Sequence, residues 1–280
     1  SQLDRWLHTS HGLDKRDIAT PDNLRLMHRS YYGLVSYVDD MVGKLLDELE
    51  EQGIADDTIV IFTSDHGDML GSRGMIQKRC FYEQSARVPL LVRHPALVNP
   101  GRAVSEVVSL VDLLPTMVDV SGLPSHLCAP FDGHSLMPLM DGEAAANRIV
   151  FSEMHSDGVY GPCFMATRGK YKYVMIHGHG AQLFDLDQDP GEWENLAGSP
   201  EVAEVEAQLS KAILDRFDPA AIDKDIRDSA ERRLVIEAAM KINGTRWDYQ
   251  PAEDVTSIYS RQKHPAPEAV SRAPMAFKQA

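Results

Sequence analysis

The chain of 280 residues carries 43% hydrophobic and 25% charged side chains, which is the composition of a globular protein with one large domain or two smaller ones. Its net charge of −14 argues against nucleic acid or an anionic membrane as a partner, because both require a basic surface. It contains no stretch of 18 uncharged apolar residues, which argues against a membrane span.

The first residues resemble neither a signal peptide nor a natural start, and no initiator methionine is present. We therefore expect the chain to begin inside a longer protein, so that its compartment, cytoplasmic or periplasmic, cannot be read from this end. The cysteines Cys80, Cys128 and Cys163 are scattered and odd in number. This pattern favours reduced thiols over a disulfide framework.

The first predicted element is a long amphipathic helix over Pro21–Glu51. Its apolar residues recur at steps of three and four, as they do along one face of a helix. Thr20 is the expected N-cap and Gly53 the expected stop. The next segment, Thr58–Thr63, is short, β-branched and apolar at almost every position. Apolarity on both faces is typical of a buried parallel strand.

Two further strands and a helix are predicted before residue 148. Val88–Val92 has the same apolar character as the first strand, and Val104–Leu110 is the third candidate. Asp112 is expected to cap a helix that reaches Val120 and ends at Gly122. This order of elements predicts a layered α/β sheet with helices on its faces, covering residues 1–148.

The pattern changes at Ile149. Short apolar segments separated by glycine-containing turns predict an antiparallel sheet, with strands at 149–151, 163–167, 170–175 and 182–186. Helices are expected at 200–217 and 229–242. These elements form a predicted smaller domain over residues 149–245, and residues 246–280 are predicted to be an extended tail.

Polar residues that suit a metal site follow the first predicted strand directly, in the run Ser64-Asp65-His66-Gly67-Asp68. In open α/β sheets, ligands bind at the carboxyl ends of the strands, where Asp65 and His66 would emerge. A carboxylate beside an imidazole suits a divalent cation. Gly67 would let the backbone turn sharply beneath the site. The alternative is that Asp65 caps the next turn and His66 is a polar loop residue.

The residues around this run closely resemble the sulfatase family of the alkaline phosphatase superfamily. The resemblance rests on the segment Asp57–Asp68, on Lys78 and on Phe81–Leu90. It extends in the same order through the segments 36–46, 110–116, 131–136 and 183–196. It implies an alkaline-phosphatase-like layered fold and hydrolysis of sulfuric esters.

The resemblance also implies roles for individual residues. Asp65 and His66 would supply half of a divalent-metal site, with Ca²⁺ expected and Mg²⁺ or Mn²⁺ as alternatives. Lys78, on the following loop, would contact the sulfate oxygens of a small sulfate ester. An ammonium group and a metal ion together stabilise the charge on a transferring group. Without the resemblance, Lys78 would be read as a solvated loop lysine.

The family's nucleophile is a formylglycine made from the cysteine of a C-x-P-x-R motif. The run Cys128-Ala129-Pro130-Phe131-Asp132 begins in the same way, but Asp132 stands where arginine is required, and the run lies downstream of the metal motif. Cys80 and Cys163 are expected to be small buried side chains. The formylglycine and two further acidic ligands are therefore expected upstream of this chain, which alone would not turn over substrate.

Two features resemble the choline-sulfatase branch, namely the spacing from Gly71 to Pro89 and the segment Arg246–Pro251. A cationic head group would need carboxylates and aromatic rings, for which Glu153, Asp157, Trp247 and Asp248 are candidates. The alternative is that these are ordinary surface residues. The tail would also join subunits of a homo-oligomer.

Two other functions share these sequence features. A phosphonate monoester or phosphodiester hydrolase of the same superfamily would need the same metal and lysine. A non-catalytic sulfatase-like module would keep the fold without the chemistry.

Overall fold

The computed structural model describes residues 20–95, 100–124, 130–143, 148–155, 159 and 161–244. The chain divides into two compact units, 1–226 and 227–280, and the features below lie in the first unless stated otherwise. Within the described ranges, no helix is both long and apolar enough to cross a membrane.

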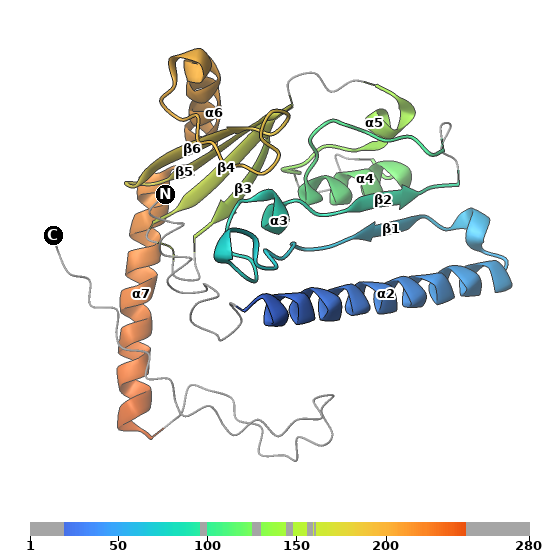
Figure 1. Cartoon of the computed structure of the whole chain (residues 1–280), viewed down its shortest axis with the longest axis horizontal. Helices are drawn as coiled ribbons and strands as arrows, with labels where there is room; N and C mark the ends of the chain where they lie inside the picture. The colour runs from blue at the N-terminus through green and yellow to red at the C-terminus, as the bar shows by residue number, and fades with distance from the viewer. Residues whose placement is uncertain are drawn as a thin grey trace. The chain divides into compact units, whose positions relative to one another are not determined.

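The predicted long helix is confirmed as α2, Pro21–Glu51. The Thr20 hydroxyl accepts a hydrogen bond from the backbone N–H of Asn23, and Pro21 occupies the first turn. Gly53 follows the helix with a φ of 69°, a conformation that glycine adopts without strain. None of the residues of α2 is buried, although the helix carries an apolar face. Figure 1 shows α2 running below the strands β1 and β2.

The first two predicted strands are present as β1, Val60–Thr63, and β2, Leu90–Arg93. The expectation that Thr58–Thr63 is a buried parallel strand is wrong for this chain, because β1 pairs antiparallel with β2 in a sheet of two strands. Phe62 and Leu91 are 38% and 59% exposed. Apolar residues on both faces therefore indicated a strand correctly, but neither its burial nor its direction.

The third predicted strand, Val104–Leu110, is also wrong, because residues 104–109 form no strand and 110–112 form a turn of 3₁₀ helix, η4. The carboxylate of Asp112 accepts hydrogen bonds from the backbone N–H groups of Ser109 at 2.7 Å and His134 at 2.9 Å. It also forms an ion pair with Arg148. These contacts bend the backbone into a helical start at the point where the apolar pattern suggested extension.

The helices around the site are short. The predicted helix after Asp112 is confirmed as α4, Leu113–Val120, and α5 covers Met137–Asp141. The single-turn helix α3, Glu83–Ala86, precedes β2. Turns of 3₁₀ helix lie at Ala55–Asp57 (η2) and Ser72–Gly74 (η3).

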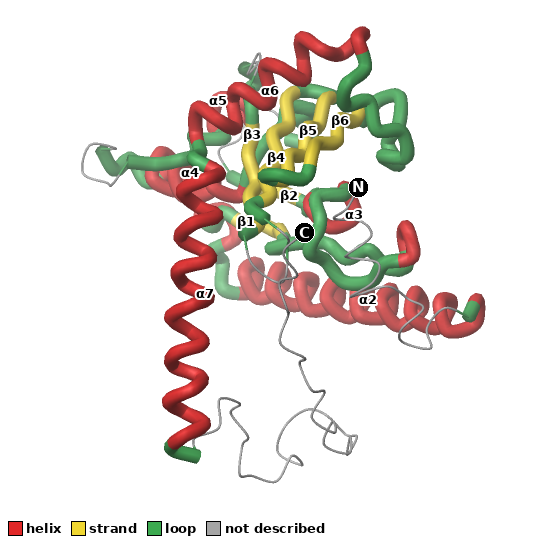
Figure 2. Tube along the Cα trace, turned by 90° about the vertical axis from the view of Figure 1, so that its left-hand side faces the viewer, coloured by secondary structure: helices red, strands yellow, loops and turns green. Residues whose placement is uncertain are grey.

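The predicted antiparallel sheet is confirmed. It consists of β3 (Val150–Met154), β4 (Cys163–Arg168), β5 (Tyr171–Ile176) and β6 (Gly180–Asp185). Each strand pairs antiparallel with the next one in the chain, so that the spatial order is β3-β4-β5-β6. Figure 2 shows the four strands side by side in this order. Short turns join β4 to β5 and β5 to β6, as in a meander.

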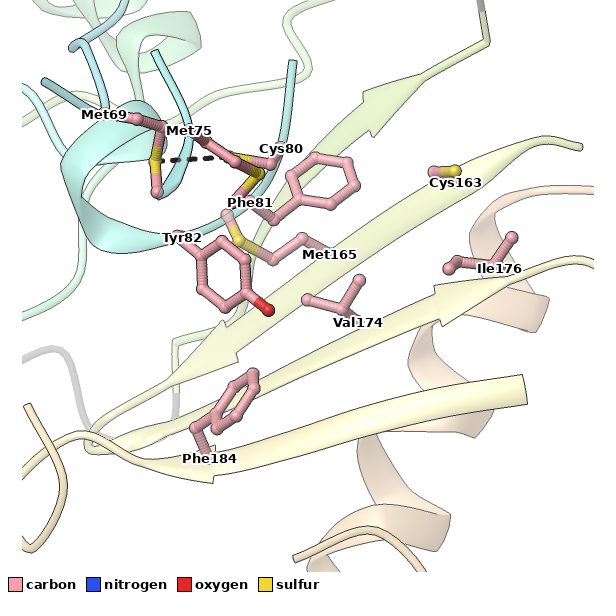
Figure 3. Packing of buried hydrophobic residues seen from close by; sticks show 10 residues of the cluster. All are labelled: Met69, Met75, Cys80, Phe81, Tyr82, Cys163, Met165, Val174, Ile176 and Phe184. Carbon is pink, nitrogen blue, oxygen red and sulfur yellow. Dashed lines mark hydrogen bonds between the residues drawn. The ribbon is translucent and has the colours of Figure 1, made fainter. Parts of the chain in front are cut away.

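The two faces of this sheet pack against different parts of the chain. Because side chains alternate along a strand, Phe164 and Leu183 lie on one face and Met165 and Val174 on the other. The first face packs against α6 through Leu209 and Ile213, both fully buried. The second face packs against residues 69–82, and Figure 3 shows the side chains that meet there: Met69, Met75, Cys80, Phe81, Tyr82, Cys163, Met165, Val174, Ile176 and Phe184.

Two helices follow the sheet, as predicted. The first predicted helix appears as the 3₁₀ turn η6, Pro200–Val202, continued by α6, Ala203–Arg216. The second, α7, covers Pro219–Ile242 and so begins ten residues before the predicted start at residue 229. Its residues from Arg227 onward belong to the second unit.

Candidate active site

Asp65 and His66 lie one and two residues beyond Ser64, immediately after the carboxyl end of β1. Gly67 comes next, and the sequence suggested that it turns the backbone. The structure gives a different reason, because a Cβ atom at Gly67 would lie 2.1 Å from the carbonyl oxygen of Gln84. The N–H of Gly67 donates to the carbonyl of Ser85 at 2.8 Å. Only glycine permits this close approach to α3.

The hydrogen bonds of His66 determine which ring nitrogen carries the proton. Nδ1 lies 2.8 Å from the carbonyl oxygen of Gly67, and Nε2 lies 2.6 Å from Nζ of Lys78. A carbonyl oxygen only accepts and an ammonium group only donates. Nδ1 therefore carries the hydrogen, and Nε2 presents its lone pair. This is the form of histidine that binds a metal ion.

The two oxygens of Asp65 have different surroundings. Oδ1 accepts a hydrogen bond from the backbone N–H of His66 at 3.0 Å, which fixes the carboxylate. Oδ2 lies 3.5 Å from Nε2 of His66, and the Asp65 side chain is 85% exposed. A carboxylate oxygen and an imidazole lone pair at this separation fit a shared divalent cation.

These two side chains do not make a complete metal site. Within the part of the chain that the structure describes, no three His, Cys, Asp or Glu side chains gather as metal ligands. Asp65 and His66 alone would therefore supply only part of the ligands that a hard cation needs.

Lys78 comes from the loop over residues 67–82, called the site loop below. Its neighbours Gln77 and Arg79 both have positive φ, 68° and 88°, which is uncommon for residues other than glycine. The carboxylate of Asp68 accepts from the N–H groups of Leu70 at 2.8 Å and Gln77 at 3.1 Å. This bond pattern folds the loop back so that Lys78 reaches His66, twelve residues earlier.

Three charged residues on or beneath the site loop, Lys172, Glu192 and Arg73, were not singled out from the sequence. Lys172 on β5 is 1% exposed, and its Nζ donates to the carbonyl of Phe81 at 2.7 Å and to Glu192 at 2.6 Å. The guanidinium of Arg73 lies over the rings of Tyr82 and Trp193 at 4.0 and 4.3 Å. The available signal was that Lys172 shares the inward face of a strand with Val174 and Ile176.

The predicted substrate residues are only partly described. Glu153 lies on β3, where its Oε2 is 2.7 Å from Nε2 of His155. The His155 ring in turn lies 5.0 Å from that of Phe164. Asp157, Trp247 and Asp248 lie outside the described residues.

The described cysteines do not suit a nucleophilic role. Cys80 and Cys163 are both buried, as expected from the sequence. The Sγ of Cys80 donates to the Met69 sulfur at 3.5 Å, drawn as the dashed line in Figure 3. Burial raises the pKa of the Cys163 thiol to about 12, so it stays protonated at neutral pH. Cys128 lies outside the described residues.

A groove of about 1520 Å³ opens beside Asp65, between β2, residues 100–110 and the sheet. It is lined by Glu83, Arg87, Arg102 and Lys170, among others, but neither His66 nor Lys78 lines it. Of the three candidate site residues, Asp65 therefore lines the groove, whereas His66 and Lys78 do not.

Family models match most of the described chain. A sulfatase model matches residues 9–123, and a model described as N-sulphoglucosamine sulphohydrolase, C-terminal, matches residues 71–218. The chain belongs to the sulfatase family. The two models overlap across the site loop, so the segment that carries Lys78 is typical of the family in both.

Similar proteins of known name support this assignment. Choline-sulfatase from Rhizobium meliloti (strain 1021) is 37% identical over 249 residues, which are 86% of this chain and 48% of that protein. Human arylsulfatase K is 35% identical over 190 residues, 64% of this chain and 35% of its own length. The chain thus spans less than half the length of these relatives.

Solved structures confirm the alkaline-phosphatase-like fold. A 2-O GAG sulfatase aligns with a TM-score of 0.69 at 27% identity, over 81% of this chain and 50% of that one. A phosphonate monoester hydrolase from Agrobacterium radiobacter aligns with a TM-score of 0.62 at 30% identity, over 70% of this chain and 42% of that one. The fold is therefore shared by enzymes that act on sulfur and on phosphorus esters.

Proposed function

We propose that the chain is part of a sulfuric ester hydrolase in which Asp65 and His66 hold a divalent metal and Lys78 contacts the sulfate group. The observation that carries this proposal is that Nζ of Lys78 lies 2.6 Å from Nε2 of His66. Both residues lie in the segment that the sulfatase model matches. Ca²⁺ is the proposed metal, with Mg²⁺ or Mn²⁺ as alternatives.

The chain's own residues would act on charge and orientation. When bound, the metal would act as a Lewis acid toward the sulfate oxygens. The Lys78 ammonium donates hydrogen bonds and offsets negative charge on the transferring group, which lowers the barrier if the contact strengthens in the transition state. The hydrogen bond from Nδ1 to Gly67 fixes the His66 ring, with Nε2 turned toward Lys78. Because Nε2 has one lone pair, a metal bound there would take the place of the Lys78 contact and leave the ammonium group free to donate to the sulfate. We place the formylglycine nucleophile and the remaining metal ligands outside this chain.

A second candidate is a phosphonate monoester or phosphodiester hydrolase. The structural similarity to the Agrobacterium radiobacter enzyme, at 30% identity, favours keeping it. Both reactions place a charged tetrahedral ester beside a metal and a lysine, so Lys78 and His66 would keep the same roles.

For the substrate, we propose a small sulfate ester with a cationic head group, such as choline sulfate. The support is the 37% identity to choline-sulfatase, together with the candidate carboxylates and rings of Glu153, Asp157, Trp247 and Asp248. Glu153 is half exposed and paired with His155, so it keeps oxygen surface to offer a cation.

We also propose that residues 246–280 join subunits of a homo-oligomer. Trp247 and Tyr249 are the side-chain types that dominate interface energies. Deleting residues 245–280 from the full-length protein should lower its mass in solution, measured by light scattering. An unchanged oligomer would remove this part of the proposal.

The central test is a substrate panel on the full-length protein. It compares choline sulfate, an aryl sulfate, a phosphonate monoester and a phosphodiester, with bound metal measured on the same samples. Asp65→Ala should abolish hydrolysis and lower the metal content. The exposed Asp22→Ala, on α2, is the matched control and should change neither. Preference for phosphorus esters would select the second candidate, and no hydrolysis of any ester would select the non-catalytic module.

A further inference from the structure

The site loop is fastened to the sheet by a buried charged cluster, called the Lys172 junction below: Lys172, Glu83 and Glu192. The Nζ of Lys172 lies 2.7 Å from Glu83 Oε1 and 2.6 Å from Glu192 Oε1. The second oxygen of Glu192 accepts the backbone N–H of Glu83 at 2.7 Å. The side chains of Lys172 and Glu192 are 1% and 0% exposed.

Three bonds of the junction end on the segment that follows Lys78, at Phe81 and Glu83. Lys172 also donates to the carbonyl of Phe81, three residues beyond Lys78. The junction therefore fixes both the carbonyl of Phe81 and the N–H of Glu83. Arg73 adds a contact from the other end of the loop, because its guanidinium donates to the carbonyls of Gly191 and Glu192. Both arms of the site loop are thus tied to residues 191–192.

Burying these charges costs free energy that a contact serving stability alone would not require. Burial raises the pKa of Glu192, which means that the low-polarity surroundings disfavour its charge. Apolar residues of similar volume commonly stabilise a protein as well as a buried ion pair does. The feature that apolar residues would not supply is the set of directed bonds to Phe81 and Glu83.

We propose that Lys172 is a positioning residue, which holds the site loop so that Lys78 meets Nε2 of His66. It contacts neither of the two, and it acts through the backbone of Phe81 and Glu83. The inference rests on the proposed function for the catalytic roles of Lys78 and His66. The order of the site loop itself is measured without substrate and does not depend on those roles.

The test uses hydrogen exchange on the 280-residue chain. Lys172→Met should speed amide exchange across residues 68–82 by about tenfold or more, relative to the reference helix α6, residues 203–216. The matched control is Lys170→Met, which removes an ion pair between Asp185 and a partly exposed lysine that directly precedes the same strand. It should leave the exchange of the site loop unchanged.

A spectroscopic readout separates positioning from stability. At one fixed pH, ¹⁵N shifts of the His66 ring should show a protonated Nδ1 and an unprotonated Nε2 in the parent chain and in Lys170→Met. In Lys172→Met, they should show a mixture of the two tautomers. The double variant Lys172→Met/Glu192→Met replaces the buried pair by apolar side chains of similar volume, and it should regain the parent's melting temperature.

The double variant decides the question even if the single variant does not fold. We expect it to keep fast loop exchange and a mixed His66 tautomer at a restored melting temperature. Recovery of loop order together with stability would show that Lys172 serves only to neutralise Glu192, and would overturn the proposal. Unchanged exchange and tautomer in Lys172→Met would overturn it as well. Loss of ester hydrolysis bears only on the proposed function.

Discussion

Two regions of this chain carry equally clear apolar patterns but differ in what covers them. In the sheet β3–β6, the alternation places Phe164 and Leu183 against α6 and Met165 and Val174 against the site loop, and these side chains are 0–7% exposed. In α2, by contrast, Leu34 and Tyr37 are 64% and 61% exposed, and no residue is buried. The spacing of apolar residues predicts which face of a helix or strand packs against another element, but not which element that is.

The candidate site draws on the packed sheet and on another open element, the strand β1. Asp65 and His66 follow β1, whose Phe62 is 38% exposed, whereas Lys78 belongs to a loop packed on the buried sheet. The well-packed region therefore holds the loop that carries Lys78, and the strand end of the open region carries the two proposed metal ligands. The effects of substitutions on the free energy of unfolding should therefore differ between the two regions in size and even in sign.

The largest expected difference lies in core truncation. Phe164→Ala should lower the free energy of unfolding by about 3–5 kcal/mol, because it empties a site between His155 and Phe217. Tyr37→Ala, on the exposed face of α2, should change it by less than about 0.5 kcal/mol. Urea unfolding of the chain measures both. Equal losses would mean that α2 is packed as tightly as the sheet.

The next effect concerns catalysis. Lys78→Ala in the full-length protein should lower kcat for a sulfate ester by about 10²–10³-fold, the usual cost of removing one charge-stabilising donor. Lys211→Ala, which removes an exposed lysine from α6, is the control and should keep full activity. A rise in KM with kcat unchanged would instead indicate that Lys78 binds substrate and transition state equally.

Two glycines should respond to alanine in opposite directions. Gly67→Ala should destabilise the chain by about 1–3 kcal/mol, since the new Cβ would lie 2.1 Å from a backbone oxygen. Gly33→Ala, in the middle of α2 with open space around it, should stabilise by about 0.5–1 kcal/mol through helix propensity. Thermal melts of the two variants provide the comparison. Destabilisation by Gly33→Ala would show that α2 has a close neighbour.

The smallest effect is a pH dependence at the sheet edge. Burial tends to raise the pKa of Asp185, but hydrogen bonds from Lys170 and from the backbone N–H groups of Gln188 and Asp187 outweigh it and lower the pKa. A carboxyl group whose pKa is lowered by folding stabilises the protein fully above its usual pKa, near pH 4. This contribution to stability is lost as the pH falls through the pKa of the folded state. The stability advantage of the parent over Asp185→Asn should therefore shrink below about pH 4. A constant difference would contradict the assignment.

Much of the fold could be predicted because local signals agreed with one another. Thr20, Pro21 and Gly53 mark both ends of α2, and glycine-containing turns separate the strands of the sheet. The direction of β1 could not be predicted, because apolarity on both faces does not report which edge is paired. The segment predicted as a strand at 104–110 ends instead in a helical turn, where the Asp112 carboxylate binds the N–H of Ser109, a contact that periodicity does not register.

The site was predicted in part for a similar reason. The sequence placed Asp65, His66 and Lys78 in one neighbourhood through a family resemblance and a strand end, and the structure brings all three together. The Lys172 junction was not identified from the sequence, because the partners of Lys172 lie 91 and 20 residues away in sequence. A lysine on the apolar face of a strand was the signal, but only the folded structure shows that it contacts Phe81 and Glu192.

The most direct test of the account is a crystal structure of the full-length protein with metal and a sulfate ester or sulfate bound, with the metal located by its anomalous scattering. The account predicts that one metal ion is bound by an oxygen of Asp65 and by Nε2 of His66, at about 2.0–2.6 Å. Nζ of Lys78 should then donate to a sulfate oxygen on the same side of the ion. A metal bound elsewhere, or a His66 ring turned so that Nδ1 faces the ion, would contradict it.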